Sequence, residues 1–323
     1  MLRSHLKHLV CPTCRAGLSL SGSEKRVREG ALVCSRCGNS FAVVNYIPRF
    51  VSSDNYAAGF GLEWNRHAHL QHDSSSGLGL SADRFFTQTG WPRRMDGEVL
   101  IEPGSGGGRF TEQAASTGAT VLSLDYSSAV DANYLLNGHN DNVLIVQGDI
   151  YQMPFPDEYA DRIFCFGVLQ HTPDPRRAFL SLCRHLKPGG ELAADVYVKS
   201  LGRFWLQTKY LVRPFTRRME PERLYRWVHR YVDLMWPVAS LIRRVPKLGP
   251  SINWRLLIAD YSNEGVTGPA LKEWAYLDTF DMLAPRYDQP QTMKTVQAWL
   301  EEAPLDGEVF SGMNGIAVRA IRT

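Results

Sequence analysis

The chain has 323 residues, of which 44% are hydrophobic and 21% charged, a composition typical of a globular protein with one large domain or two modest ones. No stretch reaches the roughly 18 consecutive apolar residues of a membrane span, and the first ten residues lack the apolar segment of a signal peptide, so we expect a cytoplasmic protein. The net charge of +3 hides a basic segment, because residues 199–258 hold 13 Lys and Arg but only three Asp and Glu. We look for an anionic partner first at this segment.

Four of the six cysteines lie near the start of the chain, in two C-x-x-C pairs with 19 residues between them. The pairs are Cys11 with Cys14 and Cys34 with Cys37. A hairpin that joins two such pairs places four thiolates around one ion, and the spacing is typical of a zinc ribbon. A redox-active pair normally opens a helix, whereas proline and glycine mark turns here. Four protein ligands leave no open position on the metal, so we predict a structural zinc ion within residues 1–51.

Residues 52–97 join this ribbon to the next folded segment. They contain three histidines, His67, His69 and His72, whose spacing does not align three ligands on one face of a helix. We therefore interpret this stretch as polar and solvated, not as a metal site.

From residue 98 onward, short apolar runs alternate with helical stretches. The predicted strands are residues 98–103, 120–125, 142–147, 161–167 and 191–198, and the predicted helices between them are residues 109–117, 127–137 and 174–186. This alternation indicates βαβ units and a parallel sheet that helices cover on both faces. Ligands of such sheets bind beyond the carboxyl ends of the strands, where the first strand here ends in a run of glycines.

The glycine run has the form Glu102-x-Gly104-x-Gly106-x-Gly108. A dinucleotide fingerprint would place its last glycine at Arg109, and a phosphate-binding P-loop would end in a lysine that is missing here. The run resembles the first motif of class I S-adenosylmethionine-dependent methyltransferases, in which the cofactor lies against bare backbone. Many members have a small or apolar residue where Pro103 stands. Because proline lacks an N–H donor, we expect the amino group of the cofactor to rely on Glu102 and loop carbonyls.

Further motifs follow in the order of that family. Asp125 closes the second predicted strand, where a carboxylate can accept both ribose hydroxyls. Asp149 and Ile150 match the adenine-binding position, the segment after residue 161 resembles the fourth motif, and the last residues resemble the antiparallel sixth and seventh strands. The resemblance implies that the cofactor contacts Glu102, Gly104, Gly106, Gly108, Asp125, Tyr126, Asp149, Ile150 and Gly167. It implies an α/β fold with a doubly wound, mostly parallel, Rossmann-like sheet of seven strands over residues 98–323. It also implies that residues 52–97 form a linker and helices that cap the cofactor, and the front end resembles the zinc ribbon of several bacterial methyltransferases.

Two sets of residues are candidates for the acceptor side. His171 follows the fourth strand and can serve as a general base, although a capping or packing role is the alternative. Asp278 and Asp281 lie at helical spacing near several aromatic residues, and Tyr287 follows a turn, so these three are second candidates for acting on the substrate. The alternative for them is a solvated acidic face.

A basic helical insertion is predicted over residues 199–270. Apolar residues recur on one face of a helix that Pro237 interrupts, while Arg223, Arg226 and Arg230 cluster on the other side. The apolar positions are Leu224, Trp227, Tyr231, Leu234, Val238, Leu241 and Val245. The insertion can be a lid with a solvated cationic face, or it can bind an anionic substrate, a membrane surface or RNA. The amphipathic stripe favours a lid over a small or lipid-linked anionic substrate.

Three functions remain open at this point. The first is methyl transfer from S-adenosylmethionine to O or N of a small molecule, such as a sugar, a lipid-linked saccharide or a natural product. The second is methylation of a base in RNA, because a zinc ribbon before this fold also resembles a family that methylates ribosomal RNA. The third is a scaffold that binds the cofactor without catalysis.

Overall fold

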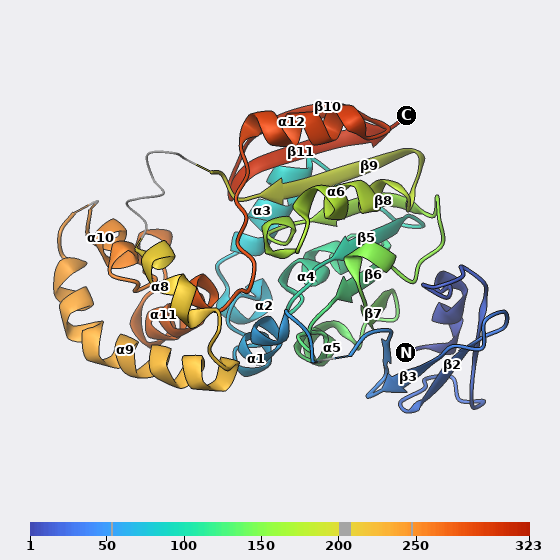
Figure 1. Cartoon of the computed structure of the whole chain (residues 1–323), viewed down its shortest axis with the longest axis horizontal. Coiled ribbons are helices and arrows are strands. Elements are labelled where there is room, and N and C mark those ends of the chain that lie inside the picture. Colours follow the sequence, from blue (N-terminus) through green and yellow to red (C-terminus); the bar gives the residue numbers. More distant parts are fainter. Residues whose placement is uncertain (53, 200–207, 247) are drawn as a thin grey trace.

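The computed structural model describes residues 1–52, 54–199, 208–246 and 248–323, and one continuous sheet of eleven strands forms its centre (Figure 1). The strand order is β1-β2-β3-β4-β7-β6-β5-β8-β9-β11-β10. The strands are β1 (Leu18–Leu20), β2 (Gly30–Cys34), β3 (Ser40–Val44), β4 (Ile47–Arg49), β5 (Val99–Pro103), β6 (Thr120–Asp125), β7 (Val143–Gln147), β8 (Ala160–Cys165), β9 (Leu186–Val196), β10 (Leu305–Gly312) and β11 (Gly315–Arg322).

The predicted seven-stranded sheet corresponds to β5–β11. Strands β5–β9 are parallel to their neighbours, whereas β11 is antiparallel to β9 and β10 is antiparallel to β11. The five residues of β7 are all buried, as expected for a parallel strand that is covered on both faces. The prediction that this sheet is α/β and doubly wound is confirmed.

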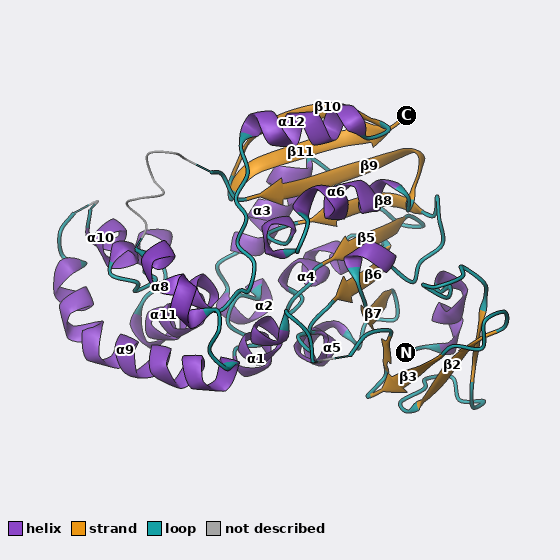
Figure 2. Ribbon diagram, viewed as in Figure 1, coloured by secondary structure: helices purple, strands orange, loops and turns teal. Residues whose placement is uncertain are grey.

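Helices cover both faces of the sheet (Figure 2). One apolar cluster packs α3, α4 and α5 against it, and the other packs α6 and α12. The α-helices are α1 (Ala58–Arg66), α2 (Asp73–Ser76), α3 (Leu80–Thr89), α4 (Arg109–Ser116), α5 (Val130–Asn137), α6 (Pro175–Cys183), α8 (Lys209–Thr216), α9 (Pro221–Ile242), α10 (Gly249–Arg255), α11 (Gly268–Leu283) and α12 (Met293–Glu302). The 3-10 helices are η1 (Arg3–His8), η2 (Ile150–Gln152), η3 (Leu169–His171) and η4 (Ser262–Glu264).

The fifth strand of the parallel set begins earlier than predicted. The predicted strand covers residues 191–198, but β9 already starts at Leu186. Its pairing with β8 shifts register between Ala160 and Arg162, and Gly189 adopts a φ of +77° in this irregular stretch. Glycine supplies the left-handed conformation there.

The amino-terminal ribbon continues the sheet. Strand β4 pairs in parallel with β7 through Arg49 and Gln147, and the Phe50 amide donates to the Gln147 carbonyl at 2.8 Å. The two segments also share one apolar core, in which Leu9 and Val43 of the ribbon cluster with Met153 and Phe155. Sequence patterns predict the ribbon and the sheet separately, whereas the structure joins them.

Helices α8, α9, α10 and α11, called the insertion helices below, pack around a core of their own. In Figure 1 they lie at the left, and the arrowheads of β8 and β9 point toward them. Their core contains Leu224, Val228 and Val232 of α9 together with Ala275 and Phe280 of α11. This unit continues to Leu283, beyond the predicted boundary at residue 270. Residues 200–207 of the predicted insertion lie outside the described residues.

The apolar stripe that the sequence indicates on α9 is not the face that packs. Trp227, Leu234, Val238 and Leu241 of that stripe are exposed. Helix α9 has a second apolar stripe, and that stripe packs against α11. The helix also runs through Pro237 without a break. Among the described residues, no helix is long and apolar enough to cross a membrane.

Candidate active site

A cavity of about 750 Å³ lies between the sheet and the insertion helices. Its floor is the glycine loop after β5 and the ends of β6, β8 and β9, and its other walls come from α1, α8, α10 and α11. The sequence-predicted site residues that line it are Gly104, Gly106, Asp125, Tyr126, Ile150, Gly167, His171, Asp278 and Asp281. The structure thus brings most of the predicted residues to one chamber, at the strand ends where α/β sheets bind ligands.

The glycine loop is crowded by protein side chains as well as open to the cavity. Gly104 and Gly108 have φ values of +79° and +87°, and a Cβ at either would lie 2.2 Å from a neighbouring side-chain atom, of Val168 and Asn133 respectively. The ring of Trp64 on α1 lies over Gly106, where a Cβ would come within 3.1 Å of the ring nitrogen. We predicted glycines here so that a cofactor could approach the backbone. The structure shows that left-handed backbone and close protein packing also require them.

Asp125 organises the end of β6. Its Oδ2 accepts a hydrogen bond from the Gly106 amide at 2.8 Å, and its Oδ1 accepts from the amide and hydroxyl of Ser127, both at 2.7 Å. Burial raises the pKa of this carboxyl, while these hydrogen bonds oppose the shift. The next residue, Tyr126, stacks on Tyr56 with ring centroids 4.9 Å apart, and both rings line the cavity. Asp125 therefore faces the crevice as predicted, held by the glycine loop itself.

Three residues predicted to contact the cofactor are not among the lining residues. Glu102 is buried behind the loop, where the Thr111 hydroxyl donates to it, and burial raises the pKa of its carboxyl to about 8. Asp149 caps η2 by accepting from the Tyr151 amide at 2.9 Å. Gly108 faces the side chains of α5 instead. In this structure Glu102 supports the loop from the core, while Asp149 and Gly108 contact neighbouring protein groups.

His171 points into the cavity between aromatic rings. Its ring makes edge contacts with Phe60 and Tyr197, at centroid distances of 5.3 and 5.5 Å. Its Nδ1 lies 3.0 Å from the Tyr287 carbonyl oxygen, which can only accept a hydrogen bond. Nδ1 therefore carries the proton, and Nε2 is left with the lone pair that a general base needs.

Tyr287 reaches the site through its backbone. Its carbonyl orients His171, whereas its ring packs edge-on against Tyr56, 5.3 Å between centroids, and is not among the lining residues. The predicted substrate contact by this side chain is thus replaced in the structure by a backbone contact to His171.

The carboxylates of α11 face the cavity, so the alternative of a solvated acidic face is wrong. Burial raises the pKa of Asp278 to about 7 and also raises the pKa of Asp281. Gln71 donates to Asp278 Oδ1 at 3.4 Å, while its buried Oδ2 has no hydrogen-bond partner among the described residues. Behind them, Glu63 on α1 is 1% exposed, and its pKa is raised well above the ordinary value by burial and by these two aspartates. The acceptor side of the cavity is therefore rich in hydrogen-bond acceptors.

Sequence reasoning missed several lining residues. Asp288 pairs with Lys209 at 3.1 Å, and Arg84 pairs with Asp195 at 2.6 Å, so these cations are neutralised within the protein. Tyr197 follows β9, and the rule that ligands bind beyond strand ends could have identified it. Lys209 begins α8 and Tyr261 lies in the loop before η4, and no motif marks either residue.

The histidines of the linker are packed, not solvated. His67 Nε2 lies 2.8 Å from the Tyr225 hydroxyl, and His72 Nε2 lies 2.9 Å from the Gly107 carbonyl. Both side chains are buried, while His69 is exposed. The prediction of a solvated stretch is therefore wrong for His67 and His72, because this segment docks α1 and α2 against the glycine loop and α9.

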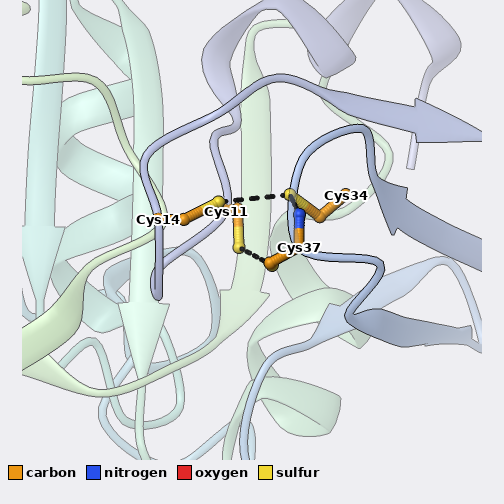
Figure 3. Close-up of side chains that lie close together, drawn as sticks. All are labelled: Cys11, Cys14, Cys34 and Cys37. Atoms are coloured by element: carbon orange, nitrogen blue, oxygen red, sulfur yellow. Dashed lines mark hydrogen bonds between the residues drawn. The ribbon is translucent and has the colours of Figure 1, made fainter.

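Four cysteines of the ribbon converge, as Figure 3 shows. The sulfur atoms of Cys11, Cys14, Cys34 and Cys37 all lie within 4.8 Å of one another. The Cys11–Cys37 and Cys14–Cys34 sulfur distances are 3.6 and 3.3 Å. Tetrahedral zinc with Zn–S bonds of about 2.3 Å would space its sulfurs about 3.8 Å apart. The cluster therefore fits a four-thiolate metal site, and it is the one such group found in the described part of the chain.

Comparison with known proteins identifies the central segment. Residues 101–194 match the family model described as a methyltransferase domain. The chain contains a class I S-adenosylmethionine-dependent methyltransferase domain. The matched segment holds the glycine loop, Asp125 and His171, but neither the ribbon nor the insertion helices, which supply much of the acceptor wall.

Curated relatives match part of the chain. An uncharacterized chloroplastic methyltransferase of Arabidopsis thaliana is 26% identical over 136 residues, 39% of this chain and 38% of its own length. A ubiquinone biosynthesis O-methyltransferase of Xylella fastidiosa is 28% identical over 153 residues, 44% of this chain and 57% of its own. The matches thus span less than two thirds of either relative.

Among solved structures, the chain is similar to a phosphoethanolamine N-methyltransferase of Haemonchus contortus. The two are 20% identical, with a TM-score of 0.37, and the match covers 46% of this chain and 34% of the other.

Proposed function

We propose that the protein transfers the methyl group of S-adenosylmethionine to an oxygen or nitrogen atom of a small polar molecule. The observation that carries this proposal is the cavity that joins the glycine loop and Asp125 to His171, Asp278 and Asp281. A sugar, a lipid-linked saccharide or a natural product with hydroxyl or amino groups fits these acceptors. The cofactor would supply an electrophilic methyl group. The protein's own side chains would bind and orient the acceptor and remove its proton.

The cofactor half of the cavity has groups that suit a nucleoside. The Asp125 carboxylate can accept hydrogen bonds from ribose hydroxyls, as an acid at this place does in nucleotide-binding sheets. Tyr126 and Ile150 offer flat and apolar surface beside it, and Trp64 covers the loop. Exclusion of water by such a cover strengthens the polar contacts within the site.

The acceptor half suits a nucleophile that must lose a proton. Nε2 of His171 is free to accept it, while Asp278 and Asp281 can hold hydroxyl or amino groups of the acceptor in place. Lys209 and Arg84 are already paired with carboxylates, so Arg109 and Arg255, which also line the cavity, are the cations that could meet an anionic part of the substrate.

The zinc ion belongs to this proposal as a structural element. The four thiols would hold it in a closed site without an open position for substrate. We propose a cytoplasmic location, because a metal site made of four thiolates needs cysteines that stay reduced.

The test combines cofactor binding with methyl transfer. Titration calorimetry should detect S-adenosylmethionine, and labelled methyl should enter a small-molecule fraction of a cell extract. The variant His171→Asn keeps an N–H group that can donate to the Tyr287 carbonyl, but it lacks the imidazole base. We therefore expect His171→Asn to lower kcat about 100-fold or more with little change in cofactor affinity.

The exposed His69 provides the matched control, and His69→Asn should behave as the wild type. Label that enters RNA instead of small molecules would replace this function with RNA methylation. Failure to bind the cofactor at all would refute methyl transfer altogether.

A further inference from the structure

Helix α9 carries an apolar stripe on its solvent-facing side. Leu234 and Leu241 are 77% and 64% exposed, and Trp227, Val238 and the nearby Val245 are exposed as well. At 100° per residue the four positions within α9 fall within about 60° of one another, so they form one narrow stripe, and Val245 follows the end of the helix. Figure 1 shows α9 as the long outer helix of the insertion.

The exposed stripe is separate from the face through which α9 packs in the protein core. The opposite side of α9 is packed through Leu224, Val228, Val232 and Ala239, all of which are buried. An exposed row of large apolar residues on a helix that already has a buried face indicates a second contact surface.

Positive charge lies beside the stripe. Arg223, Arg226 and Arg230 are exposed, and on the helical wheel they fall along one border of the apolar row, not on the other side of the helix as predicted from the sequence. Arg244, which follows the end of α9, is exposed as well. None of the four forms an ion pair with a carboxylate in the described residues. By contrast Asp233, the acid on the solvent side, is paired with Lys272 at 2.6 Å. The border of the stripe is therefore an uncompensated cationic row.

Helix α10 extends the apolar surface on the other border. It is fixed to α9 because the Tyr231 hydroxyl donates to the Leu256 carbonyl and the Asn253 amide donates to the Ala239 carbonyl at 3.0 Å. Two further exposed apolar residues, Leu248 and Ile252, lie on or next to this helix.

We propose that this face of α9 and α10 docks on an anionic phospholipid membrane surface. A helix with a cationic row beside an apolar row lies in the plane of such a surface, with arginines at the phosphates and apolar side chains among the acyl chains. Trp227, stacked on Tyr231 at 5.4 Å, has the amphipathic ring that favours the interface. The proposal does not depend on the reaction proposed above.

Two other occupants fit less well. RNA would match the arginines, but it offers nothing to bury Leu234 and Leu241, and Trp227 is already stacked on a protein ring. A second copy would match the apolar row, but a two-fold contact through one helix face brings like charges of the arginine rows toward each other.

The test is co-sedimentation of the full-length protein with vesicles. Phosphatidylcholine vesicles are compared with vesicles that also contain phosphatidylglycerol, at low and high salt. We expect binding to the anionic vesicles that weakens as salt rises. Leu234→Glu with Leu241→Glu should lower the partition coefficient at least about ten-fold, since both side chains would leave the acyl region. Arg226→Glu with Arg230→Glu should lower it at least about 25-fold, at about five-fold per arginine.

Matched controls lie elsewhere on the surface. Leu135→Glu changes an equally exposed leucine of α5, and Lys294→Glu reverses an exposed charge near the start of α12. Both should bind vesicles as the wild type does. Because all the altered side chains are exposed, each variant is expected to keep the wild-type melting temperature, which is measured alongside.

Three results would overturn the proposal. The first is binding that the α9 variants leave unchanged, and the second is no vesicle binding by the wild type. The third is evidence for another partner: the protein binds RNA or dimerises, the α9 variants abolish that contact, and the wild type does not bind vesicles.

Discussion

Asp125 links the cofactor crevice to the glycine loop through both of its oxygens. Asp125→Asn keeps the shape but removes the charge and one acceptor, so either the Gly106 or the Ser127 amide loses its partner. We expect the dissociation constant for S-adenosylmethionine to rise about 10- to 100-fold, since a hydrogen bond to a charged group contributes about 1.5–3 kcal/mol. Titration calorimetry measures the change.

Asp131→Asn is the control for this substitution, because that carboxylate pairs with Arg49 at the surface of α5. It should bind the cofactor as the wild type does. Equal affinities for both variants and the wild type would show that Asp125 does not hold the ribose.

Asp278 gives the protein a measurable pH dependence. Its pKa is raised to about 7 by burial, whereas in the unfolded chain it titrates near pH 4. The folded state thus binds more protons than the unfolded state between these values, and the stability that protonation provides is lost as pH rises through 7. We expect Asp278→Asn to be more stable than the wild type at pH 8, on the order of 2 kcal/mol after allowance for water in the cavity.

Denaturant unfolding at pH 4 and pH 8 checks this expectation. The stability difference between the variant and the wild type should widen as pH rises. A difference that stays constant, or one that narrows, would contradict a buried Asp278 whose pKa is raised.

The site residues that sequence could identify are those that belong to local motifs. Gly104, Asp125 and His171 stand at the ends of predicted strands, and strand ends meet at one edge of a parallel sheet. Whether a side chain lines the cavity depends on packing with residues far away in the sequence. The sequence therefore could not show that Glu102 and Asp149 do not line it. The same holds for Tyr287, whose backbone and not its ring meets His171.

Helix α1 sits on α5 through a glycine. A Cβ at Gly61 would lie 2.2 Å from the Ser128 hydroxyl, and Asn65 on the same helix donates to the Ser128 carbonyl at 2.9 Å. Alanine favours a helix by about 1 kcal/mol over glycine, but overpacking costs about 1–3 kcal/mol. We expect Gly61→Ala to move α1, and with it the Trp64 cover, so that cofactor affinity falls several-fold in calorimetry.

A second substitution separates the clash from other effects. Ser128→Ala removes the hydroxyl, so the double variant should recover part of the lost affinity. If Gly61→Ala alone binds the cofactor as tightly as the wild type does, α1 does not have to stay in this position.

Sequence periodicity predicted α9 but not its orientation. The helix has two apolar stripes, one that contains Leu224 and Val228 and another that contains Leu234 and Leu241. A single helix can bury either stripe, and only the surface of α11 decides which one packs. Sequence pattern thus indicates that a helix is amphipathic, while the choice of the face belongs to tertiary structure.

The ribbon is tied to the rest of the molecule along its length. Arg15 donates to the Met153 carbonyl and pairs with Asp157, and Arg26 pairs with Asp141 at 2.7 Å. Because the two parts share one core, loss of the metal should destabilise the whole chain. We expect about one zinc ion per chain and a melting temperature at least about 5 °C lower after chelation or in Cys34→Ser.

Metal analysis and thermal unfolding test this expectation. Added zinc should restore the chelated wild type but not the Cys34→Ser protein. A protein purified without zinc whose melting temperature does not respond to chelator would refute the structural role of the metal.

The alternation of strands and helices was enough to predict the central sheet, because each βαβ unit is a local pattern. The union of ribbon and sheet was not predictable in this way. It depends on the pairing of Arg49 with Gln147, on ion pairs such as that of Arg15 with Asp157, and on a shared core, all of which join segments about 100 residues apart or more.

The place where the ribbon joins the sheet has a practical consequence. Strand β7 has β6 on one side, and only β4 and Phe50 shield its other side. A fragment that lacked residues 1–51 would expose this edge of β7, of which residues 143–146 are apolar, and such an edge is a template for strand addition by another chain. Such a fragment should aggregate when it is expressed alone, so the methyltransferase domain is best produced with its own amino-terminal segment in place.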